Sequence, residues 1–482
     1  MSEHPEAAEN MGVKMEICAV VMAAGEGKKM RSRHSKVVLR AAGKPLILWV
    51  EEALSAIGAR EQLYIVGHRQ EEVRAVLGER FAFVLQERAL GTGHAVMQAA
   101  PFLESRGGVI AVLPGDAPLI TPETLQAALT AFEEQRYDAL VITSATDKPT
   151  GYGRVVRNEN GLISRIVEEE EATEEEKGIC DVNSSFYFFK TPLLLSALGK
   201  LAAHKRNEMY YLTDTVEQLI DDGYRVGEYV TDFDEIRGVN DRVELQAAGK
   251  LLNHRICRKL MLDGVQIIDP DSTWIDPKVS IGMDTVIRAN TVIKGECTIG
   301  EDCIIGPQTR LENVRVGNET MISNSVATDC VIGEECSIGP FSHIRPGSVL
   351  GNQITIGAFV EVKNSTLGDY TRARHLTYIG DAEVGKNVNF GGGVVTCNYD
   401  GEDKSACKIG DNVFVGGNAS IISPVVLCDD SYVAAGSTIT EDVPELSLAI
   451  ARSKQTNKEK WVVRRNRIRI GKYIPPEKEF EI

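Results

Sequence analysis

The sequence contains no uninterrupted apolar run of the roughly 18 residues that a membrane-spanning helix requires. Its opening, MSEHPEAAENMGVK, is polar and lacks the apolar segment of a secretory signal peptide. These absences predict a cytoplasmic protein without membrane insertion. We interpret residues 1–14 as a disordered N-terminal tail.

An excess of positive charge is also lacking, since the formal net charge at pH 7 is −16. A general nucleic-acid-binding protein needs a broad basic surface that displaces counterions from phosphates, so the composition excludes that class. The cations that follow the short apolar run in VVMAAGEGKKMRSRHSKVV, residues 20–38, are therefore a local feature that needs its own explanation.

Closely spaced cysteines are absent as well, because none of the ten forms a Cys-x-x-Cys pair. A chain of 482 residues buries enough apolar surface to be stable without disulfides. Two pairs, Cys297 with Cys303 and Cys330 with Cys336, are six residues apart. We interpret this spacing as stacked positions of a structural repeat rather than as zinc ligation.

Residues 15–240 alternate short apolar runs with helix-like segments. Runs such as ICAVVM, QLYIVG and GVIAVLPGD are separated by segments such as PLILWVEEALSAIGA and TPETLQAALTAFEEQ. This alternation predicts a Rossmann-like, doubly wound α/β domain with a parallel sheet. Ligands of such sheets bind beyond the carboxyl ends of the strands, where both AAGEGKK and PGDAP fall, so the two loops indicate one site.

Residues 241–262 predict a linking helix. Asp241 and Glu244 suit a capping box at its start, and apolar residues follow at helical spacing. These apolar residues are Ala248, Leu252, Ile256 and Leu260.

Residues 263–455 carry a repeat of six residues, which predicts a left-handed parallel β-helix. The pattern is disturbed between about Gly368 and Ile409. We expect functional residues in this stretch, because functional sites tend to lie where a rigid scaffold is interrupted. We interpret residues 456–482 as a C-terminal tail. The repeating aliphatic residues are Ile281, Ile287, Ile293, Ile299, Ile305 and Leu311, then Val326, Ile332, Ile338, Ile344 and Leu350, then Val415, Ile421, Leu427, Val433 and Ile439.

The glycines near residue 25 match no complete nucleotide-binding fingerprint. Met22 stands at the first glycine of a Walker loop and Met30 at the third glycine of a dinucleotide fingerprint. Gly25 and Gly27 after a strand still allow backbone N–H groups to turn toward a phosphate. The alternative is a helix N-terminus with solvated lysines. The cations that would neutralise a phosphate are Lys28, Lys29, Arg31 and Lys36.

The order of the motifs resembles one enzyme family. AAGEGKKMRS, GKPL, LGTGHAV, GDAPLI, GYGR, IVEEEEAT, YYLTD and GVNDR occur in the order found in bacterial N-acetylglucosamine-1-phosphate uridylyltransferases. The repeat half adds FVEVKN, HLTYIGDAEVG, NYDG, VFVGG and QTNKEKW, which resemble the glucosamine-1-phosphate acetyltransferase domain fused to that enzyme. The resemblance covers residues 15–461 and rests on the joint order of motifs that are weak singly.

For the first domain the resemblance implies uridylyl transfer from UTP to N-acetylglucosamine 1-phosphate with Mg²⁺. It implies that Asp116 and Asn240 bind the metal and that Lys29 and Lys36 are catalytic. Asp116 also follows an apolar strand and offers the hard oxygen that Mg²⁺ prefers, although such a residue can instead cap a turn. The UTP or UDP-sugar contacts that it implies are Ala23, Ala24, Gly25, Lys36, Gln86, Gly91, Thr92, Gly151, Glu168, Asn183 and Asn240. Without the resemblance, Gln86 and Thr92 are equally well interpreted as exposed polar side chains.

For the repeat domain the resemblance implies acetyl transfer from acetyl-CoA to glucosamine 1-phosphate. Attack on a thioester needs a neutral amine, so a base near neutral pH is required, and His375 fits. The alternative for a lone histidine is a structural hydrogen bond. The implied sugar-phosphate contacts are Arg345, Lys363, Tyr378, Asn389 and Lys404, and the implied acetyl-CoA contacts are Asn398, Tyr399, Gly417, Ala435 and Arg452.

The whole chain is thus identified as a bifunctional enzyme that makes UDP-N-acetylglucosamine, and the family implies a homotrimer. Lys28 and Lys29 stand where the family commonly has threonine and arginine. Two rival interpretations remain: a nucleotidyltransferase whose β-helix only oligomerises, and an assembly protein with a decayed site.

Overall fold

The computed structural model describes residues 16–204, 208–462 and 464–465. The tail predicted over residues 1–14, and residues 463 and 466–482 of the predicted C-terminal tail, lie outside this part. The chain forms two compact units, one reaching Ile281 and including Ala289–Cys297, the other comprising Gly282–Arg288 and the chain from Thr298. In the described ranges no helix is both long enough and apolar enough to cross a membrane.

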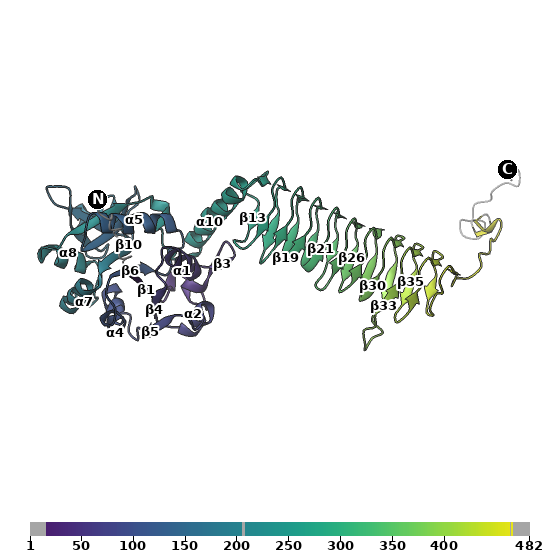
Figure 1. Ribbon diagram of the computed structural model, residues 1–482, viewed down its shortest axis with the longest axis horizontal. Helices are drawn as coiled ribbons and strands as arrows, with labels where there is room; N and C mark the ends of the chain where they lie inside the picture. Colours follow the sequence, from purple (N-terminus) through teal and green to yellow (C-terminus); the bar gives the residue numbers. More distant parts are fainter. Residues whose placement is uncertain (1–15, 205–207, 463, 466–482) are drawn as a thin grey trace, which may run out of the picture. The chain divides into compact units, whose positions relative to one another are not determined.

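The first unit is built on a nine-stranded sheet with the order β11-β7-β10-β6-β1-β4-β5, to which β8 and β9 are added (Figure 1). Neighbours of β1 run parallel to it, as the alternating pattern predicts. The strands are β1 Ile17–Ala23, β4 Glu61–Val66, β5 Ala82–Leu85, β6 Val109–Pro114, β7 Ala139–Ala145, β8 Gly153–Arg157, β9 Ile163–Val167, β10 Asp181–Lys190 and β11 Val226–Val230.

Strand β10 departs from the predicted parallel sheet, because it runs antiparallel to both β6 and β7. A parallel connection needs a crossover of a dozen or more residues, usually a helix. Before β10 the chain forms the β8–β9 hairpin and only the short helix α6, Glu174–Lys177. The sheet is therefore mixed, and the antiparallel strand β10 lies beside its centre.

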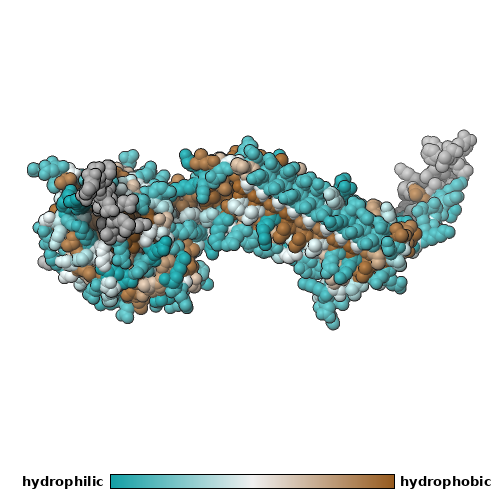
Figure 2. Space-filling model, in the orientation of Figure 1, coloured by the Kyte–Doolittle hydropathy of each residue, from teal (hydrophilic) through white to brown (hydrophobic). Residues whose placement is uncertain are grey.

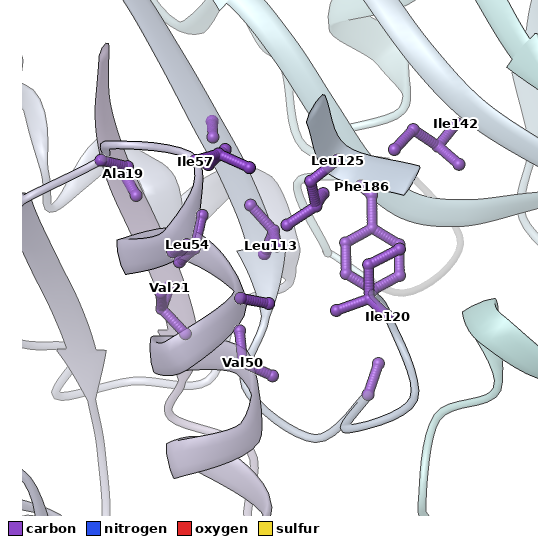
Figure 3. Close-up of a cluster of buried hydrophobic side chains, with 14 of the residues drawn as sticks. Ala19, Val21, Val50, Leu54, Ile57, Leu113, Ile120, Leu125, Ile142 and Phe186 are labelled. Carbon is purple, nitrogen blue, oxygen red and sulfur yellow. The ribbon is translucent and has the colours of Figure 1, made fainter. Parts of the chain in front are cut away.

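Helices cover both faces of this sheet. Val21 of β1 packs in a buried cluster with α1 and α5, whereas its neighbour Val20 packs on the opposite face with α3, α4, α7 and α8. Figure 3 shows Val50 and Leu54 of α1 beside Val21. Burial on both faces explains why β1 reads as a continuous apolar run. The helices are α1 Leu46–Ala56, α2 Gln70–Leu77, α3 Thr92–Met97, α4 Ala100–Glu104, α5 Pro122–Glu134, α7 Thr191–Lys200, α8 Asp214–Asp221 and α9 Phe233–Ile236.

The predicted linking helix is α10, Arg242–Leu262. The Asp241 side chain caps it by accepting the N–H groups of Val243 and Glu244, both at 2.9 Å. The Glu244 carboxylate, however, accepts the N–H of Asn240 at 2.6 Å, one residue before the position that a capping box requires. Among the predicted apolar residues, Ala248, Leu252 and Leu260 are buried and Ile256 is half-buried.

From Gln266 the chain forms the predicted left-handed parallel β-helix, with an 11-stranded sheet from β12 to β39 and a 17-stranded sheet from β13 to β38. Figure 1 shows its short strands stacked coil upon coil. The first and last strands are β12 Gln266–Ile267, β13 Trp274–Ile275, β38 Thr438–Ile439 and β39 Leu448–Ala449. The strands around the predicted site are β26 Glu361–Lys363, β27 Thr366–Leu367, β28 Arg372–His375, β29 Tyr378–Gly380, β30 Ala382–Val384, β31 Asn389–Phe390, β32 Val395–Cys397 and β33 Cys407–Ile409.

Most residues of the aliphatic ladder are buried as predicted, but Ile281 is half-buried, and Val326 is 37% exposed while Ala327 is buried in its place. The reason is that some repeats are shorter than six. The buried positions Ala327 and Ile332 are five residues apart, so a spacing of six back from Ile332 reaches Val326 instead.

The cysteine pairs were interpreted wrongly as stacked positions. Cys297 and Cys303 precede strands of different sheets, so residues six apart lie on successive faces of one coil. Stacking has a period of about one coil instead: the Cys303 N–H donates to Thr285 Oγ1, and the Cys336 N–H to Thr320 Oγ1, both at 3.0 Å. No group of three or more metal-ligating side chains occurs in the described ranges.

The disturbance predicted between Gly368 and Ile409 is much shorter than expected. Ala373, Ile379, Val384 and Phe390 continue the buried ladder through most of it. The extra residues form one loop, residues 398–406, between β32 and β33, where Tyr399 and Lys404 make an antiparallel bridge. Figure 1 shows this loop projecting from the strands beside β33.

Candidate active sites

A cavity of about 360 Å³ opens at the carboxyl ends of β1 and β6. This is the edge at which parallel α/β sheets bind ligands. Residues of both predicted loops lie on the wall of this one cavity, and its role as a binding site stays a prediction. The predicted residues on its wall are Ala23, Ala24, Gly25, Lys36, Gln86, Gly91, Thr92 and Asp116.

Lys36 is a charged residue of the cavity wall that contacts two other predicted site residues. Its ammonium forms an ion pair with Asp116 Oδ2 and donates to Asn240 Oδ1 at 3.1 Å. The backbone contributes to this arrangement, since the Val239 N–H donates to the Asp116 carbonyl at 2.9 Å. Carboxylate and amide oxygens from residues far apart in the sequence thus converge on one cation. Hard oxygen donors of this kind fit Mg²⁺.

Gln86 and Thr92 form part of the packed wall of the cavity. Gln86 is buried, with Nε2 donating to the Gly91 carbonyl at 3.2 Å, and Thr92 Oγ1 accepts the N–H of Leu212 at 3.0 Å. The alternative of exposed polar side chains is therefore wrong. Gly91 has a φ of +99°, and a Cβ there would lie 2.3 Å from the Tyr210 carbonyl oxygen, so the turn requires glycine.

The predicted sugar contacts lie beside one another, outside the wall of this cavity. Asn183 and Glu168 both flank Gly153, whose ideal Cβ would be 3.5 Å from Asn183 Cβ and 3.6 Å from Glu168 Oε2. Burial raises the pKa of the Glu168 carboxyl, which accepts a hydrogen bond from Thr213 Oγ1 at 2.9 Å. Asn183 Oδ1 accepts the N–H of Ser185, a residue of the cavity wall, at 3.2 Å.

Gly151 stands two residues before Gly153 in a turn with a φ of +89°. Its N–H donates to Glu169 Oε2 at 3.0 Å, and Glu169 also forms an ion pair with the buried Arg154 at 2.7 Å. The motif GYGR therefore contains a structural arginine that sequence reasoning missed. A buried guanidinium with a carboxylate partner fixes the turn that carries Gly151.

The remaining cations of the glycine-rich loop are exposed. Lys28 and Lys29 lie on a one-turn 3₁₀ helix, Lys28–Met30, whose Met30 is buried, so the two lysines face outward. Lys28 forms an ion pair with Glu26 at 2.7 Å. Gly27 allows Lys36 to pass closely, because a Cβ there would lie 2.9 Å from Lys36 Cβ. The catalytic role of Lys29 stays a prediction.

A second group of predicted residues lies on the 17-stranded sheet of the β-helix. Lys363 pairs in register with Gly380, and the Tyr378 hydroxyl would be 2.4 Å from a Cβ at Gly380, so the tyrosine side chain lies over this glycine. Lys363 Nζ donates to Asp381 Oδ2 at 2.9 Å, and this hydrogen bond raises the pKa of Lys363. Arg345, one coil before Lys363, donates to Glu361 Oε1 at 2.7 Å.

His375 ends β28 in the 11-stranded sheet and is exposed. Its ring makes no hydrogen bond within the part of the chain that the structure covers, so the structural alternative has no support. A corner at Leu376, with a φ of +49°, separates it from Tyr378 on the next face. Asn389 lies on the following coil, paired in register with Arg372.

Three predicted acetyl-CoA contacts follow His375 along one edge of the β-helix. An ideal Cβ at Gly392 would lie 3.4 Å from His375 Cβ, and one at Gly417 would lie 3.1 Å from the Gly392 carbonyl oxygen. Further along, Arg452 Nη1 donates to the Ala435 carbonyl at 3.0 Å. The contacts therefore lead from the histidine across successive coils to Arg452.

Asn398, Tyr399 and Lys404 belong to the inserted loop rather than to this edge. Asn398 is buried and donates to Asp381, the partner of Lys363. Tyr399 and Lys404 are exposed and face each other in the bridge at the base of the loop. Within one chain the loop is thus attached beside Lys363, through the Asn398–Asp381 hydrogen bond.

Comparison with known proteins gives matches for both halves of the chain. The MobA-like NTP transferase domain matches residues 19–204. The GMPPB C-terminal domain matches residues 270–370, and the bacterial transferase hexapeptide family, with six repeats, matches residues 406–441.

Full-length relatives carry the description bifunctional protein GlmU. The protein from Acetivibrio thermocellus is 49% identical over 454 residues, which are 94% of this chain and 98% of the relative. That from Caldanaerobacter subterraneus subsp. tengcongensis is 48% identical, over 93% of this chain and 98% of the relative. That from Halalkalibacterium halodurans is 46% identical, over 93% and 99%.

Proposed function

The chain belongs to the family of the bifunctional GlmU proteins, and we propose that its two reactions take place at the two sites that contain Lys36 and His375. The enzyme transfers an acetyl group from acetyl-CoA to glucosamine 1-phosphate. It then transfers a uridylyl group from UTP to N-acetylglucosamine 1-phosphate and releases pyrophosphate. For the second reaction, the main support is that the Asp116 carboxylate and the Asn240 amide oxygen both contact the Lys36 ammonium.

Uridylyl transfer needs positioning and charge neutralisation rather than a general base. The attacking phosphate monoester has a second pKa of about 6 and is largely dianionic at neutral pH. Its oxygen attacks the α-phosphorus of UTP, the bond to the β-phosphate oxygen breaks, and pyrophosphate leaves. Lys36 supplies positive charge on the cavity wall, and fixed charge of this kind stabilises the transferring group.

Asp116 and Asn240 would hold Mg²⁺ in this site. Their oxygens contact the same ammonium, that of Lys36, so they lie close to one another, and both are the hard donors that Mg²⁺ prefers. A bound Mg²⁺ would neutralise charge on the triphosphate. The backbone of Ala23–Gly25 and the side chain of Gln86 would bind the nucleoside, and Glu168 and Asn183 would bind the sugar.

Replacing Lys29 by alanine is expected to lower kcat/KM for UTP by about ten- to one-hundred-fold, as befits one charge-assisted hydrogen bond among several. Lys29→Arg is expected to retain or raise it, since a planar guanidinium engages two phosphate oxygens at once. Acetyl transfer should not change in either variant. Steady-state kinetics with varied UTP make the measurement.

The neighbouring Lys28 provides the matched control for Lys29. It lies on the same turn, is exposed and is already paired with Glu26. We expect Lys28→Ala to have the smaller effect. An unchanged kcat/KM in Lys29→Ala would remove this lysine from the site.

Acetyl transfer requires removal of a proton from the amine of glucosamine 1-phosphate. As the amine nitrogen bonds to the thioester carbonyl carbon, a ring nitrogen of His375 accepts the proton. The carbon–sulfur bond then breaks, and protonation of the sulfur yields the free thiol of CoA. Lys363, Arg345 and Lys404 would bind the sugar phosphate, with Tyr378 and Asn389 orienting the sugar.

A homotrimer is supported by an exposed apolar ridge beside His375, formed by Phe341, Phe359 and Leu376, which are 58%, 61% and 65% exposed. The two phenylalanine rings stack with centroids 5.4 Å apart. All three residues have φ between +49° and +60°, a strained conformation for large side chains. Figure 2 shows that apolar side chains also gather along the visible face of the β-helix. We propose that neighbouring copies cover the ridge and complete the acetyl-transfer site.

The variant Phe359→Glu is expected to dissociate the trimer and to lower acetyl transfer, because a buried carboxylate without a partner is strongly unfavourable. Uridylyl transfer should persist. Light scattering after size-exclusion chromatography measures the mass. Val349→Glu is the control, since Val349 is 42% exposed on another sheet of the β-helix. A trimer that survives Phe359→Glu would contradict this interface.

A further inference from the structure

Asp381 connects more parts of the acetyl-transfer site than sequence reasoning indicated. Its carboxylate accepts hydrogen bonds from Lys363 Nζ at 2.9 Å, from Asn364 Nδ2 at 2.7 Å and from Asn398 Nδ2. Its backbone N–H donates to the Lys363 carbonyl at 3.0 Å. One carboxylate thus connects its own coil of the β-helix with the coil before it and the coil after it.

Asp381 also anchors both ends of the inserted loop. Asn398, which begins the loop, donates to the Asp381 carboxylate, and the Cys407 N–H, which follows the loop, donates to the Asp381 carbonyl at 3.2 Å. Asp381 itself stands at the corner between β29 and β30 with a φ of +48°. Both ends of the loop that carries Lys404 are therefore anchored to Asp381.

The environment makes these contacts stronger than those of an ordinary surface pair. The side chains of Lys363 and Asp381 are only 19% and 11% exposed, so water screens their attraction less than it screens an exposed pair. An ammonium has three N–H donors, and the bond to Asp381 occupies one of them. The bond restricts the rotamers of the Lys363 side chain, so its ammonium is already held in place when a ligand binds.

We propose that Asp381 is a positioning residue of the acetyl-transfer site, which holds the Lys363 ammonium and the loop where they bind the phosphate of glucosamine 1-phosphate. This inference rests on the proposed function of Lys363 and His375. Asp381 does not take part in the proton transfer. Its loss should weaken sugar-phosphate binding and leave the chemical step largely intact.

The variant Asp381→Asn tests this role at constant size. An amide has one acceptor oxygen and one N–H₂ group, which only donates. At least one of the donors from Lys363, Asn364 and Asn398 would then lie against this N–H₂ group and lose its hydrogen bond. We expect the KM for glucosamine 1-phosphate to rise about ten- to one-hundred-fold. The kcat should change by less than about threefold, and the uridylyl-transfer rate should not change.

Asp369→Asn is the matched control. Asp369 is also a corner residue of the β-helix, where it accepts the Asn352 N–H at 2.9 Å and forms an ion pair with Lys386 at 3.2 Å. It contacts none of the proposed substrate-binding residues. Hydrogen exchange of the loop amides in the full-length protein supplies a second readout, and it should accelerate in Asp381→Asn but not in Asp369→Asn.

The possible outcomes separate this inference from the function on which it rests. If Asp381→Asn matched Asp369→Asn in KM and in loop exchange while His375→Ala lost acetyl transfer, the positioning role would be wrong and the function would stand. If the wild-type protein showed no acetyl transfer, the proposed function and this role would both fail. Should Asp381→Asn unfold, Asn398→Ala removes a single anchor, and unaltered loop exchange in that variant would overturn the proposal.

Discussion

Replacing His375 by alanine is expected to lower acetyl transfer by about 10²- to 10⁴-fold, the usual loss when a general base is removed. Uridylyl transfer from ready-made N-acetylglucosamine 1-phosphate should stay at the wild-type rate, because Lys36 and Asp116 lie in the separate α/β unit. The measurement is release of the CoA thiol, with pyrophosphate release followed in parallel.

His343→Ala is the control for this experiment. His343 is an exposed histidine of the same β-helix, in register with Glu361 of β26, and has no proposed role in proton transfer. We expect its variant to retain acetyl transfer. If His375→Ala lost both activities while its fold was intact, the assignment of the reactions to two separate sites would be wrong.

Asp116→Ala should reduce uridylyl transfer by about 10²- to 10³-fold, the range found when one electrostatic contact to a transition state is removed. The substitution deletes a carboxylate that pairs with Lys36 and would bind Mg²⁺. Pyrophosphate release should also need more Mg²⁺ to reach half of its maximal rate. Acetyl transfer should be unaffected.

Asp138→Ala controls for loss of any aspartate–lysine pair in the same unit, since Asp138 binds Lys190 at 2.7 Å. It is expected to reduce stability modestly and to keep the Mg²⁺ dependence of the wild type. Undiminished UDP-sugar formation by Asp116→Ala would exclude this carboxylate from the site.

Both folds were predictable from the sequence because their periodicities differ from each other and recur over long stretches. Local irregularities of these folds could not be predicted from the sequence. The antiparallel direction of β10 depends on how the β8–β9 hairpin and short α6 redirect the chain, which no apolar run records. Val326 was assigned inward because a six-residue spacing was assumed before Ile332, whereas the repeat there has five residues and buries Ala327.

The sites were predictable to different degrees. Lys36 and Asp116 follow strands of one sheet edge, so their meeting follows from topology, but Asn240 is 204 residues from Lys36 and was located by family resemblance alone. Asp381 was missed because its importance lies in contacts across coils. A stacking period of about one coil, rather than the six-residue repeat, would have placed it beside Lys363 and the loop.

The central claim, that one chain performs both reactions in sequence, is tested most directly by one coupled assay. Purified protein is given glucosamine 1-phosphate, UTP and Mg²⁺, and thiol and pyrophosphate release are followed with and without acetyl-CoA. We expect both products when acetyl-CoA is present, with thiol release preceding pyrophosphate release, and neither when it is absent. Absence of thiol release would favour a nucleotidyltransferase whose β-helix only oligomerises, and pyrophosphate release without acetyl-CoA would contradict the order of the two reactions.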